Sequence, residues 1–451
     1  MRIGMLCLAA LVGCVPASAS AQLTLSDAMI LAYRDSPSLR ADREGLAVLD
    51  EDVAAAKSQG RPTLVAEASL TGVDINNRDP QRIDLNGTGG ILGARLSQPL
   101  FRGLRVRNNT RAAEANVLAG RESLRQNEVD LLTSVVEEYS AVVRDQEILS
   151  LNSAMIEILS SIRSGEQRRL DLGERTKTDL SQADARLSDV MATVSRAEQR
   201  LAESSARFRA LVGVEPDELA ALPPVPPTPE TREAALDYAL DNSPRIRQAE
   251  QAARVAGYQV KAAKGVLLPT LDATASFNRR DEIVQLANQN LNQDIGSVQL
   301  TLSVPLFQGG SEYATVRRAK HVANVRKAEI EEATRDVTSD VTIAWDRVIA
   351  ARKAQAALLA AIRANVASVE GVRREALGGS RTTLDILDAE RELRDARIAH
   401  VNALQEEYVA GFRLLAALGK VTVADLGLDV PQYDPTDHYR KVSDRWIGFG
   451  P

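Results

Sequence analysis

Residues 298–310, VQLTLSVPLFQGG, decide the fold of this chain. Apolar side chains at Val298, Leu300, Leu302 and Val304 alternate with polar ones. This period-two pattern predicts a strand with one apolar and one hydrated face. Pro305 has no N–H with which to continue the pairing, and the two closing glycines allow a turn. A helical pattern of about sixty residues follows at once, so this segment joins a two-faced strand to a very long helix.

The chain repeats this joint. In residues 92–103, LGARLSQPLFRG, the residues Pro99 and Phe101 stand where Pro305 and Phe307 stand 206 residues later. We expect all four to mark strand-to-helix joints. Other correspondences hold nearly the same offset, namely Pro62-Thr63-Leu64 with Pro269-Thr270-Leu271, Gly173 with Gly379, Asp179 with Asp385 and Gly213 with Gly419. The sequence therefore predicts two halves built on one plan.

The predicted domains follow from the repeat. A first repeat spans 22–221 and a second spans 230–428, separated by a proline-rich, extended linker at 222–229. Each repeat has helices, then a β-hairpin (62–100 and 269–306), then a long helical hairpin (104–213 and 311–419). Strands of about ten residues are expected, the length a tilted strand needs to cross a bilayer. We expect the C-terminal tail, 429–451, to be irregular.

The long helices carry a coiled-coil signal. Apolar residues at Ile148, Leu151, Met155, Ile158 and Ile162 are spaced alternately by three and four, which is the heptad seam of packed helices. A helix of about 65 residues is roughly 100 Å long. Such a length exceeds an ordinary globular domain and favours a duct or a scaffold.

Residues 1–21 read as a secretory signal peptide, with Arg2, an apolar run and the small-residue cleavage site before Gln22. An alternative stays open, because residues 11–14, LVGC, resemble a lipoprotein processing site that would place a lipid on Cys14. Both cysteines, Cys7 and Cys14, lie in this segment. A chain cut after Ala21 therefore has no disulfide, thiolate nucleophile or cysteine-bound metal.

Composition argues against catalysis. The formal net charge is −6, and the three histidines have no second ligand at metal spacing. No phosphate-binding loop or nucleophile motif is present. We expect no enzyme, no cofactor, no metal and no nucleic-acid partner.

After residue 21 no apolar run is long enough for a transmembrane helix, so any crossing of a membrane must use strands. Four strands cannot close a barrel, whereas three copies supply twelve.

Asp385 and Asp388 are the carboxylates that stand out, because they follow a glycine turn and share one face of a helix. Thr382 and Asp385 fit a capping box, mirrored by Thr176 and Asp179, and Asp388 fits a solvated face. A functional interpretation of the same residues stays open beside that structural one.

The chain resembles the TolC family of outer-membrane efflux and secretion ducts. The duplicated plan, the Pro-Leu-Phe-x-Gly joints and residues 379–389, GSRTTLDILDA, carry the resemblance. It implies an α+β membrane protein: a trimeric twelve-stranded outer-membrane β-barrel, four strands per protomer, continued by a long α-helical coiled-coil tunnel in the periplasm. Asp385 and Asp388 match a gate of aspartate rings, and Arg381, Thr178 and Asp179 match a latch at the closed tip. Ala376 replaces a family tyrosine, so the latch here is looser or differently built.

The expected function is the passive exit duct of a three-part export system. The resemblance implies a homotrimer, a periplasmic adaptor, an inner-membrane ABC or proton-driven transporter and outer-membrane lipid as partners. We expect Arg381 to pair with Asp179 on a neighbouring hairpin. The cargo stays open between secreted protein and small molecule. The alternative is a periplasmic coiled-coil scaffold without a pore, which would have no use for two-faced strands of membrane length.

Overall fold

The computed structural model of the chain describes residues 22–75, 85–173, 176–284 and 289–450. The predicted signal peptide and the alternative lipidation at Cys14 lie outside these residues. The described chain forms two compact units that cut across the two sequence repeats. The first unit is built from residues up to Ala32, from Val135–Pro224 and from Ala360–Gln405. The second contains Tyr33–Ser134, Val225–Leu359 and the chain from Glu406 onward.

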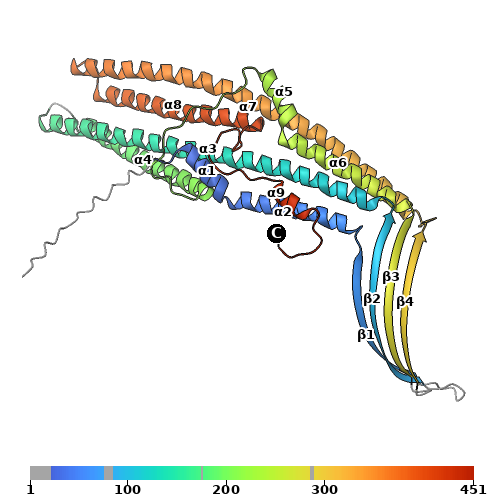
Figure 1. Ribbon diagram of the computed structural model, residues 1–451. Coiled ribbons are helices and arrows are strands. Elements are labelled where there is room, and N and C mark those ends of the chain that lie inside the picture. Colours follow the sequence, from blue (N-terminus) through green and yellow to red (C-terminus); the bar gives the residue numbers. More distant parts are fainter. Residues whose placement is uncertain (1–21, 76–84, 174–175, 285–288, 451) are drawn as a thin grey trace, which may run out of the picture. The chain divides into compact units, whose positions relative to one another are not determined.

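The second unit contains an antiparallel sheet in the order β1-β2-β3-β4 (Figure 1). The strands are β1 (Thr63–Ile75), β2 (Leu85–Arg102), β3 (Thr270–Val284) and β4 (Gln289–Ser303). They are 13 to 18 residues long, which exceeds the expected ten. The two hairpins predicted from the alternation thus join into one sheet, with β2 beside β3.

The register of the sheet puts apolar side chains on one face. Leu64 lies opposite Leu96, Leu96 opposite Ala275, and Ala275 opposite Val298. Directly paired residues point to the same side, so this row spans all four strands. Leu64 is 73% exposed and Val298 is 88% exposed in the single chain. The opposite face carries a polar row made of Thr63, Ser97, Thr274 and Gln299.

The two strand-to-helix joints differ. Strand β4 ends at Ser303, shortly before Pro305, as expected. Strand β2 instead continues past Pro99 to Arg102, with a bulge between Pro99 and Phe101. The prediction that both prolines mark the same kind of strand end is therefore wrong at Pro99. The reason is that β2 is an interior strand, and its pairing with β3 resumes beyond the residue that lacks an N–H.

A close backbone approach completes the first joint. Gly103 has φ 60°, and a Cβ atom there would lie 2.1 Å from the carbonyl oxygen of Gly265. A Cβ atom on Gly265 would in turn lie 2.3 Å from the carbonyl oxygen of Gly103. Gly265 opens the 3-10 turn Gly265–Leu267 that leads into β3. Two glycines thus let the end of one repeat's hairpin touch the start of the other's.

Helices pack together in the second unit. They are α2 (Pro37–Ser58), α5 (Arg232–Asn242), α6 (Pro244–Lys264) and α9 (Asp437–Val442), with parts of α3 (Arg105–Asp171), α7 (Ser311–Leu377) and α8 (Thr383–Ala417). A core cluster joins α5, α6, α7 and α8 through buried residues that include Ala239, Ile246, Val341 and Leu414. The tail expected to be irregular contains α9, which packs on α2 (Figure 1).

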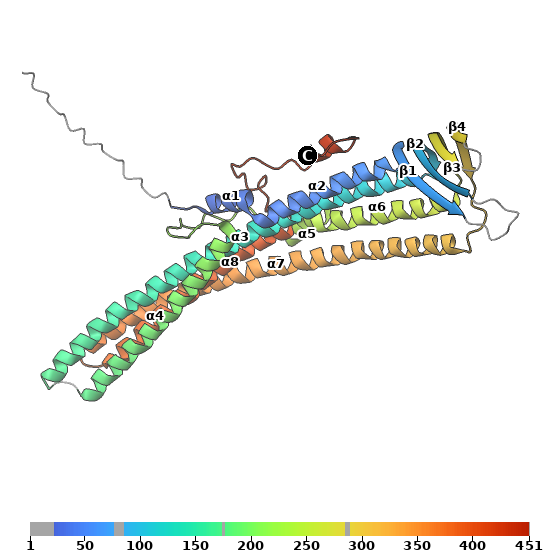
Figure 2. The same cartoon turned by 90° about the horizontal axis from the view of Figure 1, so that it is seen from below.

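The first unit contains α1 (Leu25–Asp35) in large part, α4 (Lys177–Val212) and the remaining turns of α3, α7 and α8. Helices α3 and α4 form one hairpin, and α7 and α8 form another (Figure 2). The glycines at the two turns have positive φ, 74° at Gly173 and 80° at Gly379. Met155, Leu159, Val190 and Leu387 form an apolar cluster between the hairpins. No helix in the described residues is long and apolar enough to cross a membrane.

Tyr139 ties the N-terminal segment to the linker in this unit. Its hydroxyl lies 2.9 Å from the carbonyl oxygen of Leu23 and 2.7 Å from that of Ala220. Leu23 also forms a parallel bridge with Leu219. Burial raises the pKa of Tyr139 to about 12, so the hydroxyl keeps the proton that it donates.

Candidate functional site

The predicted gate residue Asp385 lies in the first turn of α8. The backbone N–H and the hydroxyl of Thr382 each donate to Asp385 Oδ2 at 2.8 Å, and the Asp385 N–H donates back to Thr382 Oγ1 at 3.3 Å. These bonds from Thr382, and then the charge of Arg381, lower the pKa of Asp385. The capping interpretation is therefore correct for Asp385. The other carboxylate oxygen, Oδ1, faces Arg381.

The equivalent turn before α4 is built in the same way. Thr176 donates through its N–H at 3.1 Å and through its hydroxyl at 2.9 Å to Asp179 Oδ2. The Asp179 N–H donates to Thr176 Oγ1 at 3.3 Å. Thr178, another predicted latch residue, is exposed in the same first turn. The repeat therefore extends from sequence to the capping geometry of both hairpins.

Arg381 pairs within its own turn. Its Nε lies 2.9 Å from Glu375 Oε2, and its Nη1 lies 3.8 Å from Asp385 Oδ1. Hydrogen bonding to Glu375 is the main cause of the raised pKa of Arg381. Within the described protomer, Arg381 thus has two acidic partners other than Asp179. A pairing with Asp179 on a neighbouring hairpin stays a prediction.

The departure at Ala376 has a physical consequence. The Gly379 N–H donates to the Ala376 carbonyl oxygen at 3.1 Å, and the Ser380 N–H donates to that of Glu375 at 3.0 Å. Backbone carbonyls and the left-handed Gly379 therefore close the end of α7. This turn needs no large side chain at position 376.

Asp388 is one helical turn further along α8 and has a partner that the sequence did not indicate. Its Oδ1 lies 3.3 Å from Nη2 of Arg186, which belongs to α4 and hence to the other hairpin. Both side chains are partly exposed, so the pair is partly screened by water. The contact places a positive charge beside one of the two predicted gate carboxylates.

A second polar contact also links the hairpins. The Thr383 hydroxyl donates to Glu166 Oε1 at 2.8 Å, and Glu166 is a buried residue on α3. Within single hairpins, Arg163 Nε lies 2.8 Å from Asp184 Oδ1, and Arg373 pairs with Glu390. The tips therefore combine ties inside each hairpin with two contacts between the hairpins.

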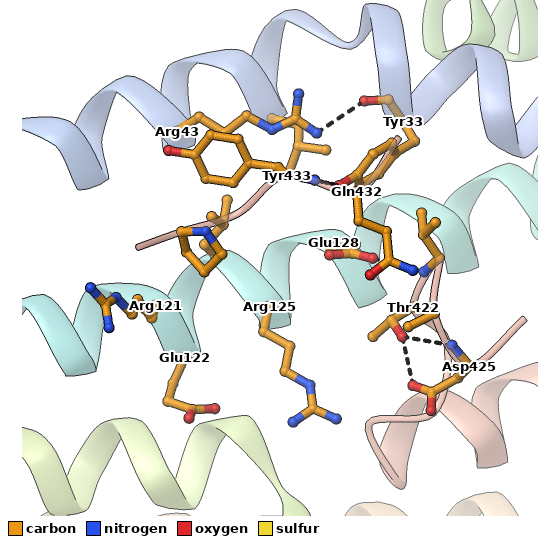
Figure 3. Close-up of a pocket in the computed structure, with 15 residues that line it drawn as sticks. Tyr33, Arg43, Arg121, Glu122, Arg125, Glu128, Thr422, Asp425, Gln432 and Tyr433 are labelled. Atoms are coloured by element: carbon orange, nitrogen blue, oxygen red, sulfur yellow. Dashed lines mark hydrogen bonds between the residues drawn. The ribbon is translucent and has the colours of Figure 1, made fainter. Parts of the chain in front are cut away.

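The second unit contains a pocket of about 370 Å³ whose lining includes none of the predicted site residues (Figure 3). The Arg43 guanidinium lies 4.7 Å from the Tyr33 ring centre and 5.1 Å from that of Tyr433. The Tyr433 N–H donates to the Tyr33 hydroxyl at 3.1 Å. The Val423 N–H donates to Glu128 Oε1 at 2.8 Å. These contacts hold the C-terminal segment on α2 and α3.

Burial is the main cause of a raised pKa of Glu128, which the hydrogen bond from Val423 partly opposes. Arg121, Glu122, Arg125 and Asp425 complete the charged lining (Figure 3). Positive and negative side chains thus line the pocket where the C-terminal segment meets α2 and α3. We interpret the pocket as part of the packing that holds this segment in place.

A family model described as outer membrane efflux protein matches residues 30–214 and 235–420, which correspond to the two repeats. The chain belongs to this family. The outer membrane efflux protein BepC of Brucella suis is 34% identical over 94% of this chain and 92% of its own. The alkaline protease secretion protein AprF of Pseudomonas aeruginosa is 28% identical over 74% of this chain and 70% of its own.

The fold is also that of a solved channel. The crystal structure of the Campylobacter jejuni CmeC outer membrane channel has a TM-score of 0.79 with this chain, at 15% identity, covering 93% of this chain and 89% of the other. The predicted TolC-family resemblance and the predicted fold class are confirmed. This outer membrane efflux protein is an exit duct of the outer membrane. Its family consists of transport channels.

Proposed function

We propose that three copies of the chain form one passive channel through the outer membrane. The observation that carries this proposal is the four-stranded sheet, in which β1 and β4 each have one edge without a partner strand in the described chain. In lipid, unpaired backbone N–H and C=O groups cost several kcal/mol each. Joining β4 of one copy to β1 of the next removes these edges, and twelve strands leave room for a channel.

The two faces of the sheet support this arrangement. The exposed apolar row with Leu64 and Val298 fits contact with lipid. The polar row with Ser97 and Thr274 fits a hydrated lumen. On the same polar face, the hydroxyls of Ser276 and Ser297 are hydrogen-bonded at 2.9 Å. A periplasmic scaffold without a pore would gain nothing from such a face.

In this proposal the gate lies at the helical tips. Threefold symmetry turns Asp385 and Asp388 into six carboxylates around one axis. Such a ring attracts cations and binds multivalent ones. Arg186 and Arg381 offset part of the repulsion within each copy. Opening requires the tips to separate, which an outside partner promotes.

That partner is a periplasmic adaptor whose helices dock beside the tips, helix against helix. An inner-membrane ABC or proton-driven transporter then delivers the cargo. BepC is named for efflux and AprF for alkaline protease secretion, so both cargo types occur among the relatives. The cargo class of this chain is set by the transporter that it serves.

Cysteine cross-linking tests the assembly directly. A chain cut after Ala21 has no cysteine of its own. One cysteine at Gln299 in β4 is combined with single cysteines placed along β1. Oxidation should give a covalent trimer at one register and not at neighbouring ones, in a protein that still conducts. A conducting protein that gives no cross-link at any β1 position would overturn the proposed pairing.

A further inference from the structure

The last residues of the chain are held at the base of the sheet. Lys57 Nζ lies 2.7 Å from Asp444 Oδ1. Arg61 Nη1 donates to the carbonyl oxygen of Arg445 at 2.6 Å, and its guanidinium lies 4.8 Å from the Trp446 ring centre. Strand β1 begins at Thr63, two residues after Arg61. The contacts therefore place Trp446 beside the point where the chain enters the sheet.

The path of the tail leads to this point. Tyr433 is held by Tyr33 and Arg43 near the start of α2 (Figure 3). His438 Nδ1 lies 3.3 Å from Oδ2 of Asp50, a buried residue in the middle of α2. Successive tail residues thus contact successive turns of α2, up to its end at Ser58. Val442, which is fully buried, fixes α9 along this path.

The tail ends in exposed apolar side chains. Trp446 is 65% exposed, Ile447 is 91% exposed, and Phe449 is fully exposed. Arg445 donates to the carbonyl oxygen of Gly450, so the chain turns back on itself and presents the three side chains around a small loop. Three large apolar side chains within four residues are unusual on a surface that faces only water.

We propose that residues 445–450, the C-terminal anchor, bind the phospholipid surface of the periplasmic leaflet. This inference rests on the proposed function, in which the strands cross the outer membrane. Because β1 begins at Thr63, residues just before it lie at the membrane boundary. Tryptophan and phenylalanine side chains favour that boundary, where an apolar ring meets polar head groups.

Charge supports the same partner. Lys57 and Arg61 lie beside the anchor and Arg445 begins it, so three positive charges gather here, and phospholipid head groups present phosphate. Asp444 offsets only one of these three cations. A lipid surface therefore matches both the exposed apolar side chains and the cations behind them.

Fluorescence quenching tests the anchor in the intact channel. The chain has two tryptophans, Trp345 and Trp446. In the variant Trp345→Phe, Trp446 is the single reporter. In vesicles of phosphatidylcholine with brominated acyl chains, it should lose most of its emission, while iodide in the water should quench it weakly. The matched control Trp446→Phe retains Trp345, which packs against the helical core and should keep its emission.

Two outcomes would overturn the inference. Strong quenching by iodide without quenching by bromolipid would place Trp446 in water. Protection from both quenchers would place it under a second copy of the chain. Conductance is measured on the same vesicles after fusion with a planar bilayer. A conducting channel with unquenched Trp446 refutes the anchor alone, whereas a protein that inserts without conducting refutes the proposed function.

Discussion

An arginine at Val298 tests which face of the sheet meets lipid. The apolar face runs along β4 from Leu302 to Asp294, where Arg279 pairs with Asp294 through two hydrogen bonds of 2.9 Å. These residues are eight positions apart, which corresponds to roughly 20 Å of depth for a strand that rises about 3.4 Å per residue at a tilt of about 40°. Val298 lies midway and is therefore the residue closest to the bilayer centre.

The expected cost of Val298→Arg is about 2–4 kcal/mol per protomer, the range for arginine at the midplane. This corresponds to a roughly 30- to 800-fold loss in the folding equilibrium. Leu300→Arg should cost less, because Leu300 lies nearer the periplasmic boundary. Gln299→Arg is the matched control, since Gln299 is adjacent in the strand but belongs to the polar row opposite Thr274.

The assay is folding into lipid vesicles across a denaturant gradient, followed by the gel shift of the heat-labile oligomer. Val298→Arg should move the midpoint to lower denaturant, and Gln299→Arg should leave it near that of the wild type. Equal shifts for the two variants would refute the assignment of faces. A larger shift for Gln299→Arg would reverse it.

Three further predictions concern the helices. Arg186→Ala removes the counter-ion of Asp388 and should strengthen block by trivalent cations in planar bilayers. The control Arg196→Ala should not, because the Arg196 side chain bonds to Ala192 and Thr193 of its own helix. Equal block in both variants would contradict the tip geometry. Glu128→Gln keeps a hydrogen-bond acceptor but removes a carboxyl whose folded pKa burial raises. Because the pKa of Glu128 is higher in the folded than in the unfolded chain, its contribution to stability is present below the unfolded pKa and is lost as pH rises through the folded pKa. The melting temperature of the wild type should therefore fall relative to that of Glu128→Gln between acidic and neutral pH. A constant difference would contradict this. Tyr139→Phe removes a single O–H donor and leaves the Ala220 carbonyl oxygen without it, whereas the Leu23 carbonyl still accepts from the Ala220 N–H. The change should cost about 1–3 kcal/mol in chemical unfolding, and an unchanged midpoint would show that water replaces the hydroxyl.

The sequence predicted the features that depend on local periodicity. The alternation around Val298 predicted β4, and Pro305 predicted its end. The seam was found only in part, because the buried positions near Met155 are Ile148, Asn152 and Leu159, while Leu151 and Ile158 flank them. The buried residues Asn152, Leu159 and Glu166 recur every seven positions, so the heptad period is right and one of the two seam positions is wrong. Two of these three residues are polar, and a pattern of apolar residues could not indicate them.

Features that depend on distant pairing were not predictable. Pro99 has the same local sequence as Pro305, yet only the neighbouring β3 allows pairing to resume after it. Arg186 is one of 55 basic residues and lies 202 positions from Asp388, so no spacing pointed to it. Helix α9 is six residues long and depends on α2 for its burial. The capping role of Asp385 was predictable because all its partners are local.

The gate is tested most directly by ion selectivity and block in planar bilayers. The double variant Asp385→Asn and Asp388→Asn removes both charges, and the asparagine at 385 keeps an oxygen that accepts the bonds from Thr382. If three copies gather these side chains around one axis, the variant should conduct, lose most of its preference for cations and no longer be blocked by trivalent cations. If it conducts with unchanged selectivity and unchanged block, the two residues are a helix cap and a surface ion pair, and the constriction lies elsewhere.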